Sequence, residues 1–440
     1  MKIKFILLIL LFIGFGQLKA QELWSLEKCV TYAIENNIQI KQQALNVNYQ
    51  ENQLKQSKYD VYPNLNAGLS QRFDFGLAKG GDDVNRSGNA MSLSGQISSN
   101  MTLFNGFTKV NTIKKRDLDL QASLQDLEKA KDDISLAVVS AYLDILFNKE
   151  LVATSKEQLV VTKQQIDYNT KQVEAGNLAK GKLLETESQA ATEQLTLTNY
   201  ENQLQISLLN LMQLLDIPVT DNFNIVIPEF NDIVLANELL NAGLIFEKAA
   251  QERPEIKSKE LKLLSSEKES EIAKAQFLPV LSLNASIGDS YTKFFDVENA
   301  SVSDQLNDYF STQVLLSLQI PIFNGFSTKI NYQNSKINYE NAKLELQLEQ
   351  NNLLKEIQQA YTNAVAAMKK YDASEKAVNS AQEAFRYVQE KFSLGIVTPL
   401  EFNDAKNKVT AAQSSFIQAK YEYIFRIKIL DFYYGKEITL

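Results

Sequence analysis

The sequence predicts a mainly α-helical protein with a smaller β portion, built from one helix–hairpin–helix unit that occurs twice. Two long stretches carry small or apolar residues alternately four and three positions apart, a 3.5-residue period typical of left-handed coiled coils. Two pairs of shorter segments alternate apolar and polar residues, as strands with two different faces do. Only 7 prolines and 16 glycines interrupt the 440 residues, which favours long helices.

The clearer coiled-coil stretch runs from Leu353 to Phe392. Its seam consists of Leu353, Ile357, Ala360, Ala364, Ala367, Tyr371, Ser374, Val378, Ala381, Phe385, Val388 and Phe392. A softer copy lies 219 residues earlier, from Ile134 to Val173, and includes Asn148, Ser155, Thr162 and Asn169. The chain therefore has two similar long helices, each of which needs partner helices.

Composition excludes several classes of function. Histidine is absent and Cys29 is the single cysteine, which excludes His-based catalysis, Cys/His zinc clusters and disulfides within one chain. The net charge of −8 and the pI near 5.1 argue against nucleic acid as a partner. The many carboxylates fall on predicted solvated helix faces. We therefore expect no enzyme activity, no cofactor and no metal site.

Residues 1–20 have the pattern of a signal peptide. Lys2 and Lys4 precede an apolar run from Phe5 to Phe15, and Leu18-Lys19-Ala20 offers a cleavage site. The alternative is a membrane anchor, for which this run is short. No later segment approaches 18 continuous apolar residues, so we predict no transmembrane helix.

The first unit is predicted to span residues 21–219. One helix begins after the N-cap Ser25, runs to about Tyr59, and is followed by Pro63. A β-hairpin at about 64–104 contains a polar loop, 78–89. A long helix then runs to a turn at about 174–182, and a returning helix follows to about Leu215.

Residues 220–238 are predicted to be a linker, and residues 239–440 repeat the first unit. Arg253-Pro254 marks a kink or restart in the first helix, which ends near Gln276. A second hairpin at about 280–323 contains a polar loop, 292–308. The second long helix ends at a turn at about 393–401, and the last helix runs to about Tyr433.

Four alternating strands are too few for a closed membrane barrel, because small barrels begin at eight strands. A membrane location therefore requires copies of the chain to pool their strands. One strand face would then contact membrane lipid, and the polar face would line a wet lumen. The lipid-facing candidates include Leu93, Ile97, Leu283, Val314, Leu316 and Leu318. The alternative is a soluble four-stranded sheet with one buried face.

Several motifs, in this order and spacing, resemble those of the TolC-like outer membrane efflux proteins, the outer membrane factors. They are Phe104-Asn105-Gly106-Phe107, Arg253-Pro254-Glu255-Ile256, Phe277-Leu278-Pro279, Ile322-Phe323-Asn324-Gly325-Phe326 and the turn from Gly395 to Ala405. The resemblance covers essentially the whole chain after residue 20. It implies a homotrimer with a 12-stranded β-barrel in the outer membrane of a Gram-negative bacterium and a long α-helical barrel in the periplasm. It also implies a periplasmic adaptor (membrane fusion) protein and an inner-membrane pump of the RND or ABC type as partners.

The two helix turns carry matching glycines, Gly176 and Gly395, at the 219-residue offset. Glycine suits a helix C-cap with a left-handed backbone, and this alone explains both. The resemblance adds that adaptor tips dock between these turns, which makes Asn177 and Ile396 candidate contacts.

Glu401 and Asp404 lie one helical turn apart, just after the second turn. Acids in the first turn of a helix are favourable for local reasons. The resemblance implies instead that they line a periplasmic constriction, with Phe392 as an aromatic gate residue. Lys182 stands where the first repeat of the family has an acid, and it could pair with Glu401 or Asp404.

These observations predict a passive exit duct of a tripartite efflux or type I secretion system, for small molecules or proteins. The alternative is a structural or adhesive coiled-coil protein of the cell envelope without a conduit.

Overall fold

The computed structural model describes residues 23–79, 85–220, 222–228, 240–295 and 298–436. The predicted signal peptide and residues 221 and 229–238 of the predicted linker lie outside them. The described residues form two compact units, which we consider separately. The helical unit contains residues 23–44, 126–256 and 349–436, and the sheet unit contains residues 45–125 and 257–348, with the gaps given above.

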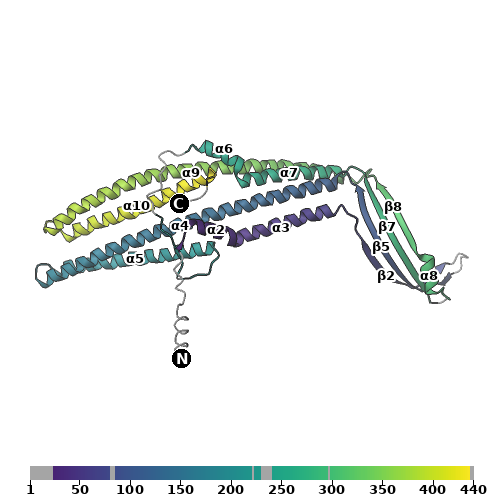
Figure 1. The fold of residues 1–440 in the computed structure, drawn as a ribbon, viewed down its shortest axis with the longest axis horizontal. Coiled ribbons are helices and arrows are strands. Elements are labelled where there is room, and N and C mark those ends of the chain that lie inside the picture. The colour runs from purple at the N-terminus through teal and green to yellow at the C-terminus, as the bar shows by residue number, and fades with distance from the viewer. Residues whose placement is uncertain (1–22, 80–84, 221, 229–239, 296–297, 437–440) are drawn as a thin grey trace, which may run out of the picture. The chain divides into compact units, whose positions relative to one another are not determined.

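Helix lengths show the duplication directly (Figure 1). In the first repeat, α2 (Leu26–Asn36), α3 (Ile38–Tyr59), α4 (Thr108–Glu174) and α5 (Lys180–Leu214) have 11, 22, 67 and 35 residues. In the second repeat, α6 (Ala242–Glu252), α7 (Pro254–Ala275), α9 (Ser327–Ser393) and α10 (Pro399–Tyr433) have the same four lengths. At 1.5 Å per residue, each 67-residue helix is about 100 Å long.

The sheet unit holds one antiparallel sheet of four strands in the order β2-β5-β7-β8. The strands are β2 (Asn66–Asp74), β5 (Ala90–Phe104), β7 (Val280–Phe294) and β8 (Ser311–Gln319). Each repeat contributes one hairpin, and the hairpins join where β5 pairs with β7. Strands β2 and β8 are therefore the two edges of the sheet.

The first helix of each repeat is broken. The prediction of one continuous helix from Ser25 to Tyr59 was wrong, because Asn37 separates α2 from α3. Its Nδ2 donates to the carbonyl of Leu214 and its Oδ1 accepts from the N–H of Gln39, both at 2.9 Å. The break predicted at Arg253-Pro254 is confirmed as a restart, since Arg253 ends α6 and Pro254 opens α7.

Short elements occupy segments for which no helix or strand was predicted. Helix α8 (Val302–Tyr309) lies in the second polar loop and is capped by the side chain of Ser301. Strands β3 (Leu77–Lys79) and β4 (Asn85–Ser87) pair within the first polar loop. Strands β1 (Leu23–Trp24) and β6 (Asn224–Ile225) form a parallel two-residue pair in the helical unit.

The main core of the helical unit lies where α2, α4 and α5 meet the β1–β6 pair. Cys29, Val138, Ile145, Leu211 and Leu215 are fully buried there. The Tyr142 hydroxyl donates to the carbonyl of Val226 at 2.6 Å and thereby ties α4 to the chain just after β6. No helix in the described part of the chain is both long enough and apolar enough to cross a membrane.

Candidate functional site

The two turns between the long and returning helices have the same backbone geometry. Gly176 and Gly395 have φ angles of 74° and 73°. The N–H of Asn177 donates to the carbonyl of Gln172 at 2.8 Å, and the N–H of Ile396 donates to that of Lys391 at 2.9 Å. These are Schellman C-caps, so the local explanation of both glycines is confirmed. Ile396 is 67% exposed, and the exposed residues Leu394 and Leu400 flank it.

Glu401 completes the N-terminal cap of α10. Its carboxylate accepts from the N–H of Thr398 at 2.7 Å and from the Thr398 hydroxyl at 3.0 Å. The N–H of Glu401 in turn donates to the Thr398 hydroxyl oxygen at 3.2 Å, which closes a capping box. These hydrogen bonds, that of the backbone N–H above all, hold the pKa of Glu401 below its usual range. Glu401 therefore caps the N-terminus of α10. Its place in a pore constriction stays a prediction.

The other predicted constriction residues have different surroundings. Asp404 is exposed one turn further along α10. Lys182 is half-buried in the first turn of α5, and within the described residues of one chain it forms no ion pair with Glu401 or Asp404. Phe392 packs against the buried Phe402 with ring centroids 4.6 Å apart, and Phe385 packs on the same ring at 5.2 Å. The ring of Phe392 is thus held between α9 and α10.

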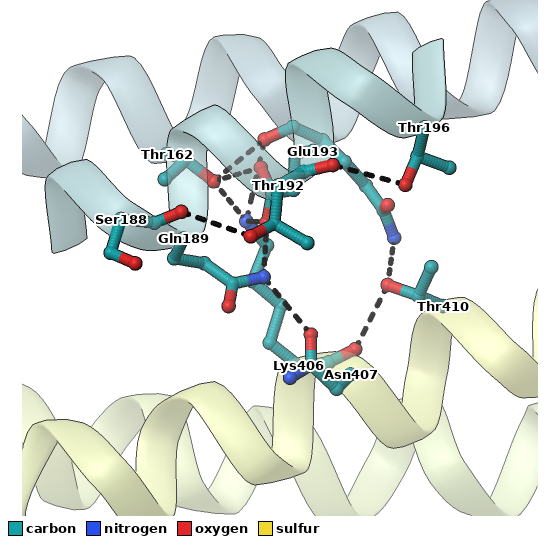
Figure 2. A network of polar contacts seen from close by, with 10 residues as sticks. Thr162, Ser188, Gln189, Thr192, Glu193, Thr196, Lys406, Asn407 and Thr410 are labelled. Atoms are coloured by element: carbon teal, nitrogen blue, oxygen red, sulfur yellow. Dashed lines mark hydrogen bonds and ion pairs between the residues drawn. The ribbon is translucent and has the colours of Figure 1, made fainter. Parts of the chain in front are cut away.

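A buried polar cluster joins the two repeats near these turns (Figure 2). The side chains of Lys406 on α10 and Glu193 on α5 are only 8% and 10% exposed, and Nζ lies 2.9 Å from Oε1. The hydroxyl of Thr162 on α4 bonds to both of them. We call Thr162, Glu193 and Lys406 the polar core. Gln189 borders it and donates to Glu193 at 3.0 Å and to Asn407 at 3.2 Å.

The polar core is one layer of a polar stripe along α4. Asn148, Ser155, Thr162 and Asn169 recur every seven residues, and all four are buried. One layer nearer the turn, Asn169 donates to the hydroxyl of Thr186 on α5 at 2.9 Å. The matching positions of α9 are Ala367, Ser374, Ala381 and Val388. The polar seam of the first repeat was visible in the sequence, but its partner Lys406 is 244 residues from Thr162 and was missed.

Strand register places the six predicted lipid-facing residues on one face of the sheet. Leu283 pairs with Leu316, Leu281 pairs with Leu318, and Ile97 pairs with Ile287. The face is exposed in the single chain, with Val314 at 70%. Asp289 and Lys293 are charged exceptions on β7. Contact of this face with lipid stays a prediction.

The opposite face of the sheet is polar. Ser70 bonds to Ser94 at 2.7 Å, Ser92 bonds to Thr292 at 3.2 Å, and Asn100 bonds to Asn284. Leu315 is the apolar exception.

Across the described residues, no three His, Cys, Asp or Glu side chains are grouped in a way that could hold a metal ion.

Comparisons with known proteins match this architecture. The model of the family described as "Outer membrane efflux protein" matches residues 30–216 and 245–431, one range in each repeat. TolC of Escherichia coli is 23% identical over a 433-residue alignment, and the match covers 93% of this chain and 82% of that protein. The alkaline protease secretion protein AprF of Pseudomonas aeruginosa is 22% identical over 72% of this chain and 64% of its own length, so the match spans less than two thirds of that relative.

Solved outer membrane channels share the fold. The structure of CusC has a TM-score of 0.80 at 17% identity and covers 94% of this chain and 92% of its own. The Campylobacter jejuni CmeC channel has a TM-score of 0.80 at 18% identity and covers 93% and 85%. The predicted combination of a coiled-coil α-barrel with a membrane β-barrel is thereby confirmed as the fold class. Because the family model matches both repeats over most of their length, the chain belongs to the outer membrane efflux protein family.

Proposed function

We propose that three copies of this chain form a passive exit duct, in which four strands from each copy close a 12-stranded barrel in the outer membrane. The four-stranded sheet carries this proposal. It has one exposed apolar face, one polar face and two edge strands, β2 and β8, that pair with nothing else among the described residues. In lipid an open edge leaves backbone groups without hydrogen bonds, so the edges must be paired by neighbouring copies.

Strand length supports a membrane location for this sheet. A transmembrane strand needs about 9–11 residues when it is tilted by about 45°. Strands β5 and β7 have 15 residues each, and β2 and β8 have 9 each. A soluble four-stranded sheet would need other parts of the chain to cover its apolar face.

Reconstitution tests the duct directly. The purified protein should run as a heat-modifiable trimer and should conduct ions in planar bilayers, because a closed barrel with a polar inner face holds a continuous column of water. A structural or adhesive envelope protein would show neither property, and the absence of both would overturn the proposal.

A periplasmic adaptor and an inner-membrane pump of the RND or ABC type complete the proposed system. One relative is named for secretion of a protease and another for export of toxins and drugs, so the pump is expected to choose the substrate. The exposed Asn177 and Ile396 are proposed adaptor contacts, because both project from the turns that end the coiled coils.

The adaptor contact can be separated from assembly. Asn177→Trp and Ile396→Trp should abolish export in cells while trimers form normally, since both side chains are exposed in the single chain. Cross-linking followed by co-purification would identify the adaptor. Normal export from both variants would remove these residues from the docking surface.

The constriction is proposed to contain Glu401, Asp404, Phe392 and Lys182. In a trimer, the exposed Asp404 and Glu401 side chains of three copies would form two acidic rings, one helical turn apart.

A further inference from the structure

The four-stranded sheet is incomplete at the end that holds Ala90 and Phe294, which we call the distal end. Strand β8 begins at Ser311, opposite Gly288. Strand β7 continues for six residues beyond this point, from Asp289 to Phe294, and stays paired with β5 on its other side. Backbone groups on the free side of these six residues need hydrogen-bond partners from elsewhere.

Side-chain amides take the place of the missing strand. The N–H of Thr292 donates to Oε1 of Gln305, on α8, at 2.9 Å. Just before α8, Asn299 accepts from the N–H of Phe294 through Oδ1 and donates to the Phe294 carbonyl through Nδ2, both at 2.7 Å. Gln305 is only 6% exposed. Helix α8 therefore lies beside the free edge of β7, in the place where β8 would continue (Figure 1).

The apolar stripe of α8 is uncovered. Val302, Leu306 and Tyr309 share one helix face and are 52%, 41% and 54% exposed, whereas Gln305 is the one buried residue of the helix. The helix has eight residues, and isolated helices this short are unstable in water. Most helical stability comes from packing of the apolar face, so α8 needs a cover that the described part of a single chain does not supply.

The opposite edge of the sheet is offset from β8. Strands β2 and β8 have nine residues each. The register across the sheet aligns Gly68, Gln96, Gly288 and Ser311. From this line, β2 reaches six residues toward the distal end, to Asp74, whereas β8 runs only away from it, to Gln319. The two edge strands therefore span different heights of the same sheet.

A six-residue offset between copies pairs these two edges completely. In the proposed barrel, β8 of one copy lies antiparallel to β2 of the next copy. Displacing the next copy by six residues sets Ser311 opposite Asp74, and Gln319 then lies opposite Asn66. All nine residues of each edge strand are paired at this offset.

The alternation of side chains agrees with the offset. A shift by an odd number of residues would set the apolar face of one strand beside the polar face of the other. With six residues, Leu316 lies opposite Leu69 of the next copy on the apolar face. On the polar face, Gln313 lies opposite Arg72 of the next copy. The register of the single chain thus indicates how far each copy is displaced along its neighbour.

The same offset brings α8 against the next copy. Beyond Asp74 of that copy lies Phe75, which is 78% exposed and stacks on Phe73 with ring centroids 6.5 Å apart. Strands lie about 4.7–4.9 Å apart, and a helix with its side chains is about 10–12 Å wide. Helix α8 therefore fills the gap above Ser311 and reaches the next chain, where Phe73 and Phe75 can cover its apolar stripe.

We propose that α8 is a clasp between copies at the distal end of the barrel. Its Gln305 closes the free edge of β7, and its apolar stripe binds Phe73 and Phe75 of the next copy. This proposal rests on the proposed function, because it requires three copies to close a barrel. A second copy is the occupant that the sheet favours, since the stripe continues the edge at which β8 meets β2.

Cross-linking between copies tests the clasp. Cys29, the single native thiol, is first replaced by alanine. In trimers that carry Tyr309→Cys and Phe75→Cys, a short bis-maleimide should join neighbouring copies into a covalent trimer that survives heating in SDS. Asp308→Cys with Phe75→Cys is the matched control, because Asp308 is exposed on α8 but lies off the apolar stripe. We expect several-fold less cross-linking in the control, and equal yields would overturn the clasp.

A second pair of sites separates the clasp from the barrel. Gln313→Cys with Arg72→Cys should form a disulfide between copies, whereas Gln313→Cys with Ser70→Cys, which corresponds to an offset of four residues, should not. Linking at Arg72 without linking at Phe75 would overturn the clasp and leave the barrel intact. Trimers that link at Ser70, or at neither site, would overturn the offset on which the clasp depends. The absence of heat-modifiable trimers would overturn the proposed function itself.

Fluorescence tests the other occupant of the stripe, which is membrane lipid. The variants Leu306→Trp and Leu316→Trp are reconstituted in phosphatidylcholine vesicles with brominated acyl chains. The emission of the wild type, which comes from Trp24 alone, is subtracted. Bromine should quench Leu306→Trp several-fold less than Leu316→Trp, because the next copy covers α8. Equally strong quenching of both variants would place the stripe in lipid and would overturn the clasp.

Discussion

Among single residues, Cys29 has a reactivity that follows from its surroundings. It is the single thiol of the chain and is fully buried against the apolar core of the helical unit. Burial raises the pKa of the Cys29 thiol to about 12, and the nearby charge of Lys28 opposes this only in part. Because the thiolate is the nucleophile, iodoacetamide at pH 8 should leave the folded protein unmodified and should alkylate it fully in denaturant. Rapid alkylation of the folded protein, measured by mass spectrometry, would contradict the burial.

Glu401 and Asp404 are predicted to make the channel prefer cations. Changing both to alanine should move the reversal potential toward anions and relieve block by trivalent cations in bilayer recordings. Thr398→Ala is the matched control, since it removes the hydroxyl of the capping box without changing charge. An unchanged selectivity in the double variant would show that these side chains do not line the pore.

The cap at Glu401 also has a predictable pH dependence. The N–H of Thr398 lowers the pKa of Glu401 in the folded protein. The ionised carboxylate of Glu401 therefore contributes to stability above the ordinary carboxyl pKa. This contribution is lost as the pH falls through the lowered pKa of Glu401 in the folded protein. The protection factors of the amides at the start of α10, which are exchange rates corrected for the intrinsic rate at each pH, should fall in that acidic window, and Glu401→Gln should remove this fall. Equal protection factors across the window in the wild type would exclude a role for the carboxylate in the cap.

For helices and strands, periodicity was enough to predict the long elements and not enough for the short ones. The bounds of α4, α9 and the four long strands were predicted closely because seams and alternation persist over many residues. The break at Asn37 depends on a hydrogen bond to Leu214, 177 residues away, and no proline marks it. Helix α8 has only eight residues within polar sequence, and β1 and β6 have two each. Elements this short carry too few positions for a period.

The pairing of α10 with α4 and α5 gives a stability prediction. Lys406→Met leaves the buried carboxylate of Glu193 without its cation, and breaking such a pair costs roughly 3–5 kcal/mol. The double variant Lys406→Met with Glu193→Met should recover much of this loss, since it buries no charge. Unfolding of the purified protein in detergent measures both effects.

An exposed pair on the same unit is the control for that experiment. Lys171 and Asp167 lie 2.6 Å apart with side chains 69% and 68% exposed. Exposed pairs contribute only about 0–1 kcal/mol, so Lys171→Met should change stability little. If Lys406→Met lowered the free energy of unfolding as little as Lys171→Met, the polar core would not couple the two repeats.

In the molecule as a whole, the outer membrane location and the exit-duct class of function predicted from the sequence are confirmed by membership of the family. The order of the five sequence motifs was enough to indicate the family, because the motifs are distributed over both repeats. The polar core could not be predicted, because periodicity places Thr162 on a seam but does not show that Glu193 and Lys406 meet it there.

Barrel assembly distinguishes the two faces of the sheet. Leu316→Arg places a charge on the apolar face, which costs about 2–4 kcal/mol at the middle of a bilayer, so the yield of trimers should fall. Gln313→Arg, on the polar face of the same strand, should assemble normally. Equal trimer yields in membranes from cells that express each variant would contradict the assignment of the faces.

The polar core also means that the two halves of the chain are no longer interchangeable. By the 219-residue offset, the counterpart of Lys406 is Glu187 and the counterpart of Glu193 is Ala412. A ring made of six copies of the first half would bring acids together where the chain now has a cation and an anion. A ring made of six copies of the second half would leave each lysine facing alanine. The two halves of the chain are therefore complementary at the polar core, and in the proposed trimer they are expected to alternate around the ring.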